Sequence, residues 1–190
     1  MGKWKFAIIL TVTVAAGVLI VGCSTGDQNS GETTTQASAS AGGGSAGRVG
    51  TAIGDSAPEF QLTKMDGSQV SLADLRGRPA VLIFWTAWCP VCKEEAPHFN
   101  ELAAQYEPRG VSVFGINIQD SVARTEGGIR DFGIRYAVAR DPDASVTRRY
   151  NVTGTPTIIL LDSNGLVQYF GNEVPADFNS RLDGLLTNGG

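Results

Sequence analysis

The sequence predicts an α/β protein in which helices pack on a layered β-sheet. Three observations lead to this prediction. Strand-like and helix-like segments alternate from about residue 51 onward. Residues Ala80–Trp85 are apolar at every position, which is typical of a central strand buried on both faces. The chain then ends in a strand pair and a helix-like segment. Its 190 residues are enough for one such domain with additional segments.

The domain is expected to open with a β-hairpin that leads to the buried strand. Apolar residues at 60, 62, 70 and 72 flank Met65–Ser68, and the Asp-Gly pair inside that segment is typical of a tight turn. Further elements follow the apolar strand at 80–85. We expect helices at 91–106, 121–132, 145–150 and 175–186, and strands at 111–118, 136–139, 157–161 and 166–170. The last two strands enclose Asp162–Gly165, a second hairpin turn.

The N-terminus has the features of an export signal. Met1–Lys5 carries two lysines, an uncharged apolar run follows over 6–21, and Gly22 precedes Cys23. This stretch resembles a bacterial lipobox, which implies a signal peptide at 1–22 and lipidation of Cys23. The alternative is an uncleaved membrane anchor, although the apolar run is shorter than the ~20 residues of a spanning helix. Both readings place the remaining chain outside the cytoplasm, at the cell membrane.

Residues 23–50 are predicted to be a flexible linker, and 51–190 the folded domain. The linker is rich in Ser, Thr, Gly and Ala, with Gly42–Ser45 as its extreme. Such a segment buries too little apolar surface to offset the entropy of ordering it. Its root-mean-square reach is roughly 30 Å, which lets the domain meet partners near the membrane.

Composition argues against several functions. The net charge is −4 and no segment is strongly basic, so we do not expect nucleic-acid binding. Three cysteines and one histidine, with Cys23 in the N-terminal segment, are too few for a structural zinc site. We therefore expect no metal and no cofactor other than a redox-active disulfide.

Cys89 and Cys92 are the candidate redox pair. Trp88-Cys89-Pro90-Val91-Cys92 joins the buried strand to a helix, and CxxC beside a βαβ pattern is typical of redox motifs. Unpaired N–H groups and the helix dipole stabilise a thiolate at a helix start, which lowers the pKa of Cys89 below about 8.5. Pro90 suits the first helical turn. Cys92 is expected to lie deeper and to resolve a mixed disulfide formed on Cys89; an inert structural disulfide is the alternative.

Glu95 is predicted to face the core, close to the sulfur atoms. Phe99, Leu102, Ala103 and Tyr106 form an apolar helical stripe, and Glu95 projects about 40° from Phe99 at ~100° per residue. Because burial disfavours a charged carboxylate, such a group can exchange the proton of Cys92 near neutral pH. The alternative is a partly solvated acid that suits the helix dipole.

Residues 55–187 resemble the TlpA/ResA/CcmG branch of the thioredoxin superfamily. The matching segments are Ala57–Phe60, Val81–Trp85, Trp88–Cys92, Glu95, Pro97, Gly154–Thr157 and Asp162–Gly165. The resemblance implies a thioredoxin-like fold: a central mixed sheet with helices on both faces, an N-terminal hairpin and an insert at about 119–141. It also implies a functional glutamate at Glu95 and a cis bond before Pro156, which would face the cysteines.

The same resemblance implies thiol–disulfide exchange with exported proteins. Many members of the branch reduce apocytochrome c, and a membrane thiol carrier would supply or accept the electrons. The backbone of Thr155 is then expected to bind an extended substrate, with Trp88, Pro90 and Val91 as further contacts. Packing in the core is the alternative for Trp88, and an ordinary turn proline the alternative for Pro156.

Other functions stay open from the sequence. Thr86–Cys89 matches the TxxC pattern of peroxiredoxins, although Leu82 stands where that pattern wants proline. A disulfide-forming oxidase and a copper or haem chaperone with the same fold are further alternatives, the last with His98 as its one histidine. Among these alternatives, we expect this protein to reduce the disulfides of other proteins.

Overall fold

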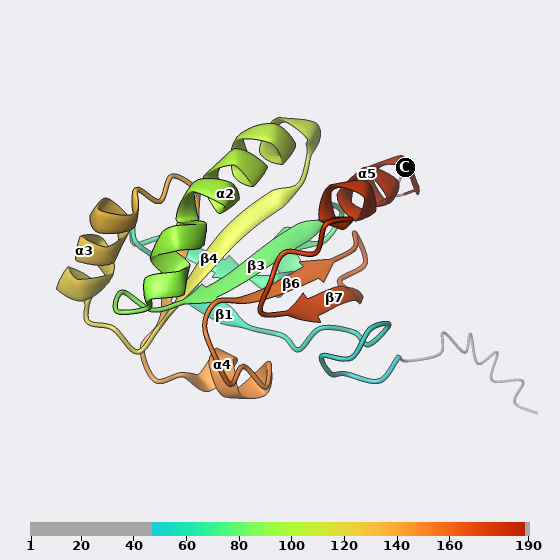
Figure 1. Cartoon of the computed structure of the whole chain (residues 1–190). Helices are drawn as coiled ribbons and strands as arrows, with labels where there is room; N and C mark the ends of the chain where they lie inside the picture. Colours follow the sequence, from blue (N-terminus) through green and yellow to red (C-terminus); the bar gives the residue numbers. More distant parts are fainter. Residues whose placement is uncertain (1–46, 189–190) are drawn as a thin grey trace, which may run out of the picture. The chain divides into compact units, whose positions relative to one another are not determined.

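The computed structural model describes residues 47–188 (Figure 1). The predicted signal peptide, Cys23 and all but the last residues of the predicted linker lie outside this range. The elements, in chain order, are β1 Gln61–Lys64, β2 Gln69–Ser71, α1 Leu72–Leu75, β3 Ala80–Trp85, α2 Pro90–Tyr106, a 3-10 turn Glu107–Arg109, β4 Ser112–Ile118, α3 Val122–Phe132, β5 Ala137–Asp141, α4 Ser145–Arg149, β6 Thr157–Leu161, β7 Val167–Gly171 and α5 Phe178–Asn188.

The seven strands form one mixed sheet in the order β2-β1-β5-β4-β3-β6-β7. Strands β3, β4 and β5 are parallel, and β6, β7, β1 and β2 join them by antiparallel pairing. In the middle of the sheet Ile83 lies opposite Gly115 of β4 and Ile158 of β6. The predicted insert forms α3 and β5, and β5 links the N-terminal hairpin to the rest of the sheet. The predicted thioredoxin-like α/β fold is confirmed.

The apolar run of β3 serves two cores. Val81, Ile83 and Trp85 pack on one face of the sheet. Ala80, Leu82 and Phe84 pack on the other. Side chains alternate between faces along a strand, so a strand covered on both sides must be apolar throughout. Figure 1 shows α2, α3 and α5 along one side of the sheet and α4 on the other.

Two local differences from the sequence prediction have clear causes. Leu72, expected in a strand, opens the short helix α1, because Ser71 and Asp74 form a capping box at its N-terminus. Residues 48–50, assigned to the linker, contact the domain. Arg48 Nε donates to Asp55 Oδ1 over 3.0 Å, and the Gly50 N–H donates to the Ser56 carbonyl over 3.0 Å. The ordered domain therefore includes the last residues of the predicted linker.

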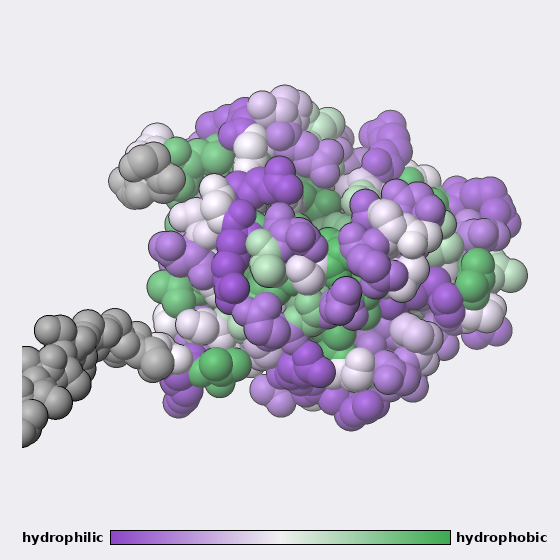
Figure 2. Space-filling model, turned by 180° about the vertical axis from the view of Figure 1, so that it is seen from behind, coloured by the Kyte–Doolittle hydropathy of each residue, from purple (hydrophilic) through white to green (hydrophobic). Residues whose placement is uncertain are grey.

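The described surface is largely polar. Figure 2 shows hydrophilic side chains over most of the face seen from behind, with smaller hydrophobic areas between them. Across residues 47–188, no helix has the length and apolar character needed to span a bilayer.

Candidate active site

The strand-to-helix junction holds the cysteine pair. β3 ends at Trp85 and α2 begins at Pro90, with Cys89 as the N-cap residue. The Cys92 N–H donates to Cys89 Sγ over 3.1 Å, so a helix-terminal N–H lies on this sulfur as predicted. Cys89 and Cys92 form a disulfide, with their Cα atoms 5.2 Å apart. The predicted pairing of the two cysteines is confirmed.

The two cysteines differ in their surroundings rather than in depth. We expected Cys92 to lie deeper, but each residue is 4 % exposed. Cys92 lines a small interior pocket together with Ile83, Trp85 and Phe99. Cys89 instead meets the loop before β6, with its Sγ 3.4 Å from the Thr155 carbonyl oxygen. Cys92 is therefore enclosed by apolar side chains, whereas Cys89 lies against polar backbone.

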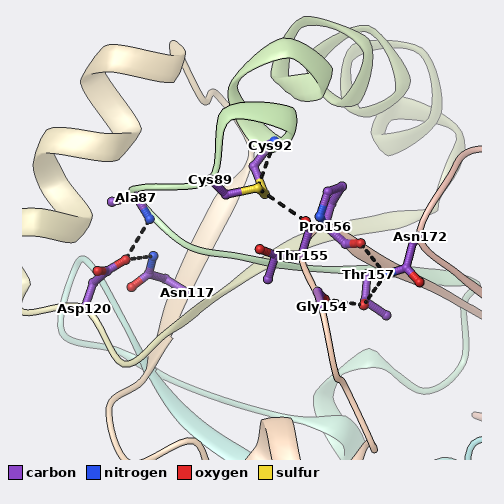
Figure 3. The surroundings of a disulfide bond; sticks show 10 residues. All are labelled: Ala87, Cys89, Cys92, Asn117, Asp120, Gly154, Thr155, Pro156, Thr157 and Asn172. Atoms are coloured by element: carbon purple, nitrogen blue, oxygen red, sulfur yellow. Dashed lines mark hydrogen bonds between the residues drawn. A yellow bond between two sulfur atoms is a disulfide. The ribbon is translucent and has the colours of Figure 1, made fainter.

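The loop opposite the cysteines contains a cis peptide bond between Thr155 and Pro156, as predicted. Figure 3 shows how its neighbours hold this loop. Asn172 Nδ2 donates to the Pro156 carbonyl over 2.7 Å and to Thr157 Oγ1 over 3.0 Å. Thr157 Oγ1 donates to the Gly154 carbonyl over 2.7 Å. The loop is thus fixed from the β7 side and presents the backbone of Thr155 to Cys89.

Two hollows flank the disulfide. One, of about 320 Å³, is bounded by Trp88, Asp120 and Gly154–Thr155. The other, of about 410 Å³, is bounded by Val91, Glu95, Pro156 and Asn172. Trp88 and Val91 are 68 % and 49 % exposed beside these hollows. Apolar side chains exposed next to a cleft are typical of a docking surface, so the core-packing alternative for Trp88 is wrong.

The comparisons with known proteins agree with this geometry. Residues 53–170 match the AhpC/TSA family. The chain belongs to this family. It is 32 % identical over 140 residues to the "Thiol-disulfide oxidoreductase ResA" of Geobacillus kaustophilus, covering 73 % of this chain and 80 % of that protein. The chain is accordingly a thiol–disulfide oxidoreductase of the thioredoxin superfamily.

Solved structures support the same assignment. A secreted Mycobacterium tuberculosis disulfide oxidoreductase homologous to E. coli DsbE is similar with a TM-score of 0.56 and 30 % identity, over 68 % of this chain and 95 % of that one. A thiol:disulfide interchange protein of the thioredoxin family from Chlorobium tepidum has a TM-score of 0.60 and 28 % identity, over 68 % of this chain and 94 % of that one.

Glu95 does not lie where the helical stripe placed it. Its side chain is 41 % exposed, and Oε2 lies 3.6 Å from Nδ1 of His98. The buried face of α2 runs through Cys92, Ala96 and Phe99 instead. In the second turn of the helix, the long Glu95 side chain lies beside this face and lines the open hollow, so its predicted burial is wrong. Its role in proton exchange remains a prediction.

Tyr136 belongs to the pocket that encloses Cys92. Burial raises the pKa of this phenol far above its ordinary value, so its hydroxyl stays neutral at physiological pH. The carboxylates of Glu95 and Asp120 are not among the residues that line this pocket. The side of Cys92 that faces this pocket therefore meets uncharged groups.

Two polar residues of the site were missed from the sequence. Asn172 follows β7 and holds the cis-proline loop. Asp120 follows β4, and its Oδ2 accepts from the Ala87 N–H over 2.7 Å, directly before Trp88 (Figure 3). The sequence contained a signal for Asp120, because Asn117 interrupts the apolar end of β4 and Asp120 follows two residues after that strand. Within residues 47–188, no three His, Cys, Asp or Glu side chains are grouped so that they could hold a metal ion.

Proposed function

We propose that this oxidoreductase is tethered to the outer side of the cell membrane and reduces disulfides in exported proteins, apocytochrome c among them. The observation that carries the proposal is the Cys89–Cys92 pair at the start of α2, facing the loop of cis-Pro156. The export signal, Cys23 and the linker support the location. The similar Mycobacterium tuberculosis disulfide oxidoreductase is a secreted protein, which agrees with a location outside the cytoplasm.

Exchange begins at Cys89 in the reduced protein. The Cys92 N–H and the start of α2 stabilise the Cys89 thiolate. This thiolate attacks one sulfur of the substrate disulfide, whose S–S bond breaks while a mixed disulfide forms. The released substrate sulfur takes a proton. Cys92, after losing its own proton, attacks Cys89 Sγ, which closes the protein disulfide and frees the second substrate thiolate. Two electrons pass from the protein to the substrate.

The substrate backbone is expected to lie along Thr155. The Thr155 N–H makes no hydrogen bond to another residue of the described domain and is free to donate to a substrate carbonyl. An extended substrate paired there would carry its cysteine past Cys89, because Cys89 Sγ lies beside the Thr155 carbonyl. Trp88, Pro90 and Val91 would contact the residues on either side.

The reduction potential of the Cys89–Cys92 couple, measured in glutathione buffers, tests the direction of electron flow. A reductant requires a potential more negative than about −200 mV, and a membrane thiol carrier must then return two electrons per cycle. A potential near −120 mV, which is typical of the oxidant DsbA, would show instead a protein that forms disulfides. The Cys89 pKa from the same samples gives the thiolate fraction.

The location is tested separately with Cys23→Ala. If Cys23 is lipidated after cleavage of the signal, the parent protein takes up a fatty-acid label, whereas this variant takes up none and keeps the exchange rate of the parent protein. A parent protein that stays in the membrane fraction without a lipid label supports the uncleaved anchor instead.

Peroxide reduction is the second candidate function, favoured by the AhpC/TSA match and by Thr86 three residues before Cys89. In that reaction the Cys89 thiolate breaks the O–O bond, which yields a sulfenic acid and an alcohol or water. Cys92 then condenses with the sulfenic acid to form the disulfide and release water. Rapid peroxide consumption that is lost in Cys89→Ser would replace our proposal.

A further inference from the structure

A buried carboxylate distant in sequence contacts the turn that precedes the cysteines. The side chain of Asp120 is 3 % exposed. Its Oδ2 accepts two hydrogen bonds, from the Ala87 N–H over 2.7 Å and from Asn117 Nδ2 over 3.0 Å (Figure 3). These donors offset the cost of burying a polar group away from water.

Rigid elements hold this carboxylate in place. Asn117, in β4, pairs with Trp85 at the end of β3 and is 1 % exposed. Its Oδ1 accepts from Thr125 Oγ1 of α3 over 2.8 Å. The network therefore connects β4, α3 and the junction that carries Cys89, and every side chain in it is buried.

The Ala87 N–H belongs to the turn that delivers the cysteine. The Cys89 N–H donates to the Thr86 carbonyl over 3.2 Å, which closes the turn Thr86–Cys89. Helix α3 also packs against this turn, since a Cβ on Gly128 would come within 2.8 Å of Ala87 Cβ. The turn thus contacts both Asp120 and α3. It leaves Trp88 68 % exposed while Cys89 stays buried at the start of α2.

The charged neighbours of Asp120 do not account for its position. Arg124 Nη1 lies 3.9 Å from Asp120 Oδ1, and the Arg124 side chain is 65 % exposed. A solvated pair at that separation contributes little. Arg140 Nη2 donates over 3.0 Å to the backbone carbonyl of Asp120 and not to its carboxylate. The short contacts of the carboxylate are thus with Ala87 and Asn117.

We propose that Asp120 is a positioning residue for thiol–disulfide exchange: by binding the Ala87 N–H it holds the Thr86–Cys89 turn in the geometry that places Cys89 at the start of α2. This role does not depend on whether the protein reduces or forms disulfides, nor on where in the cell it acts. It acts through hydrogen-bond geometry, so an uncharged acceptor at the same place can replace it.

The experiment compares Asp120→Asn with Asp120→Ala in the whole domain. Asparagine can put its carbonyl oxygen where Oδ2 lies and keep both hydrogen bonds, whereas alanine removes them. We measure the rate at which the reduced protein reacts with oxidised glutathione, over a range of pH. A misplaced reactive group can lose up to about 100-fold in rate; for Asp120→Ala we expect a loss of about 10-fold, and for Asp120→Asn a rate within about 2-fold of the parent protein.

Asn100→Ala is the matched control. Asn100 is also buried and bridges two segments, because its Nδ2 donates to the Gly133 carbonyl and its Oδ1 accepts from the Arg135 N–H, each over 2.8 Å. Its removal costs comparable hydrogen bonds without touching the turn. We expect a similar fall in melting temperature and an unchanged exchange rate, which separates positioning from general destabilisation.

Every other outcome overturns the proposal. Equal losses in Asp120→Asn and Asp120→Ala would show that charge matters and position does not. Parent-like rates in both would show no role in exchange. Hydrogen exchange at the Ala87 amide of the parent protein gives a check that needs no variant: we expect protection, and exchange as fast as in an exposed loop would contradict the hydrogen bond itself.

Discussion

The sulfur of Cys89 lies 3.4 Å from the backbone carbonyl oxygen of Thr155. In the reduced protein the Cys89 thiol can donate to this carbonyl, whereas a thiolate cannot. The thiolate is stabilised from the other side, by the Cys92 N–H at 3.1 Å. The contact with Thr155 therefore favours the thiol form of Cys89, and the contact with the Cys92 N–H favours the thiolate. A substrate that binds to the Thr155 backbone lies next to the Cys89 sulfur.

Cys92→Ser is expected to trap substrates as mixed disulfides on Cys89, because serine cannot resolve the bond. Cys89→Ser is expected to trap none, since Cys92 faces an apolar interior pocket. Non-reducing electrophoresis of each variant after reaction with a disulfide-bonded apocytochrome c measures the adducts. Equal trapping by both variants would contradict the assignment of Cys89 as the attacking thiolate.

Glu95→Gln tests the predicted proton exchange with Cys92. A general acid or base typically raises the reaction rate by about 10²–10⁴-fold. Because Glu95 is 41 % exposed and lies beside His98, we expect the exchange rate of Glu95→Gln to fall by a smaller factor, about 10-fold near neutral pH. We also expect the pH dependence of this rate to change. His98→Ala is the control, because it removes the contact between His98 and Glu95 while keeping the Glu95 carboxylate. A pH profile of exchange identical to that of the parent protein would remove Glu95 from the mechanism.

Asn172→Ala is expected to loosen the cis-proline loop. It removes the two hydrogen bonds to the Pro156 carbonyl and to Thr157 Oγ1, which stabilise the fold by about 1 kcal/mol each. We expect slower exchange with protein disulfides and a lower free energy of unfolding. Gln168→Ala, which removes a hydrogen bond to Asp162 on the same hairpin, is the control and should lower stability without slowing exchange.

Gly128→Ala should destabilise the fold by about 1–3 kcal/mol, because overpacking forces neighbours to move. The new Cβ would lie 2.8 Å from Ala87 Cβ and 2.9 Å from Trp85 Cζ3. Gly127→Ala is the neighbouring control. Its Cβ would meet nothing closer than Arg130 Nη2 at 4.0 Å, so it should stabilise α3 by up to about 1 kcal/mol. Denaturant unfolding of both variants checks the contrast.

Alkaline pH is expected to unfold the protein through its tyrosines. Burial raises the pKa of Tyr136 and Tyr150 far above the ordinary value of about 10. Below that pH the phenols are neutral in both states and stability is unaffected. Above it the unfolded chain loses these protons while the folded chain keeps them, so stability falls as pH rises. Phenolate absorbance should appear together with the loss of structure, and full ionisation in the folded state would contradict this prediction.

Local patterns predicted most of the fold. The limits of β3 and β6 agree with the sequence prediction, and α2 starts one residue earlier than expected. Glu95 shows where such patterns fail. An ideal helical projection placed it inside the apolar stripe, but Ala96 occupies the buried face instead. Projection gives an angle around the helix axis and does not say which neighbours cover that angle.

The sequence by itself determined the α/β class, the order of the elements and the position of the cysteine pair, since periodicity, turn residues and helix-start chemistry act between near neighbours in the chain. The family resemblance implied that the loop of Pro156 faces the cysteines, and the tertiary structure gave the contact of Thr155 with Cys89. Only the tertiary structure decided that Asp120 holds Ala87 and that Asn172 supports Pro156. These contacts join segments 16 to 66 residues apart. They arise when the sheet aligns its strand ends, and no local pattern records that alignment.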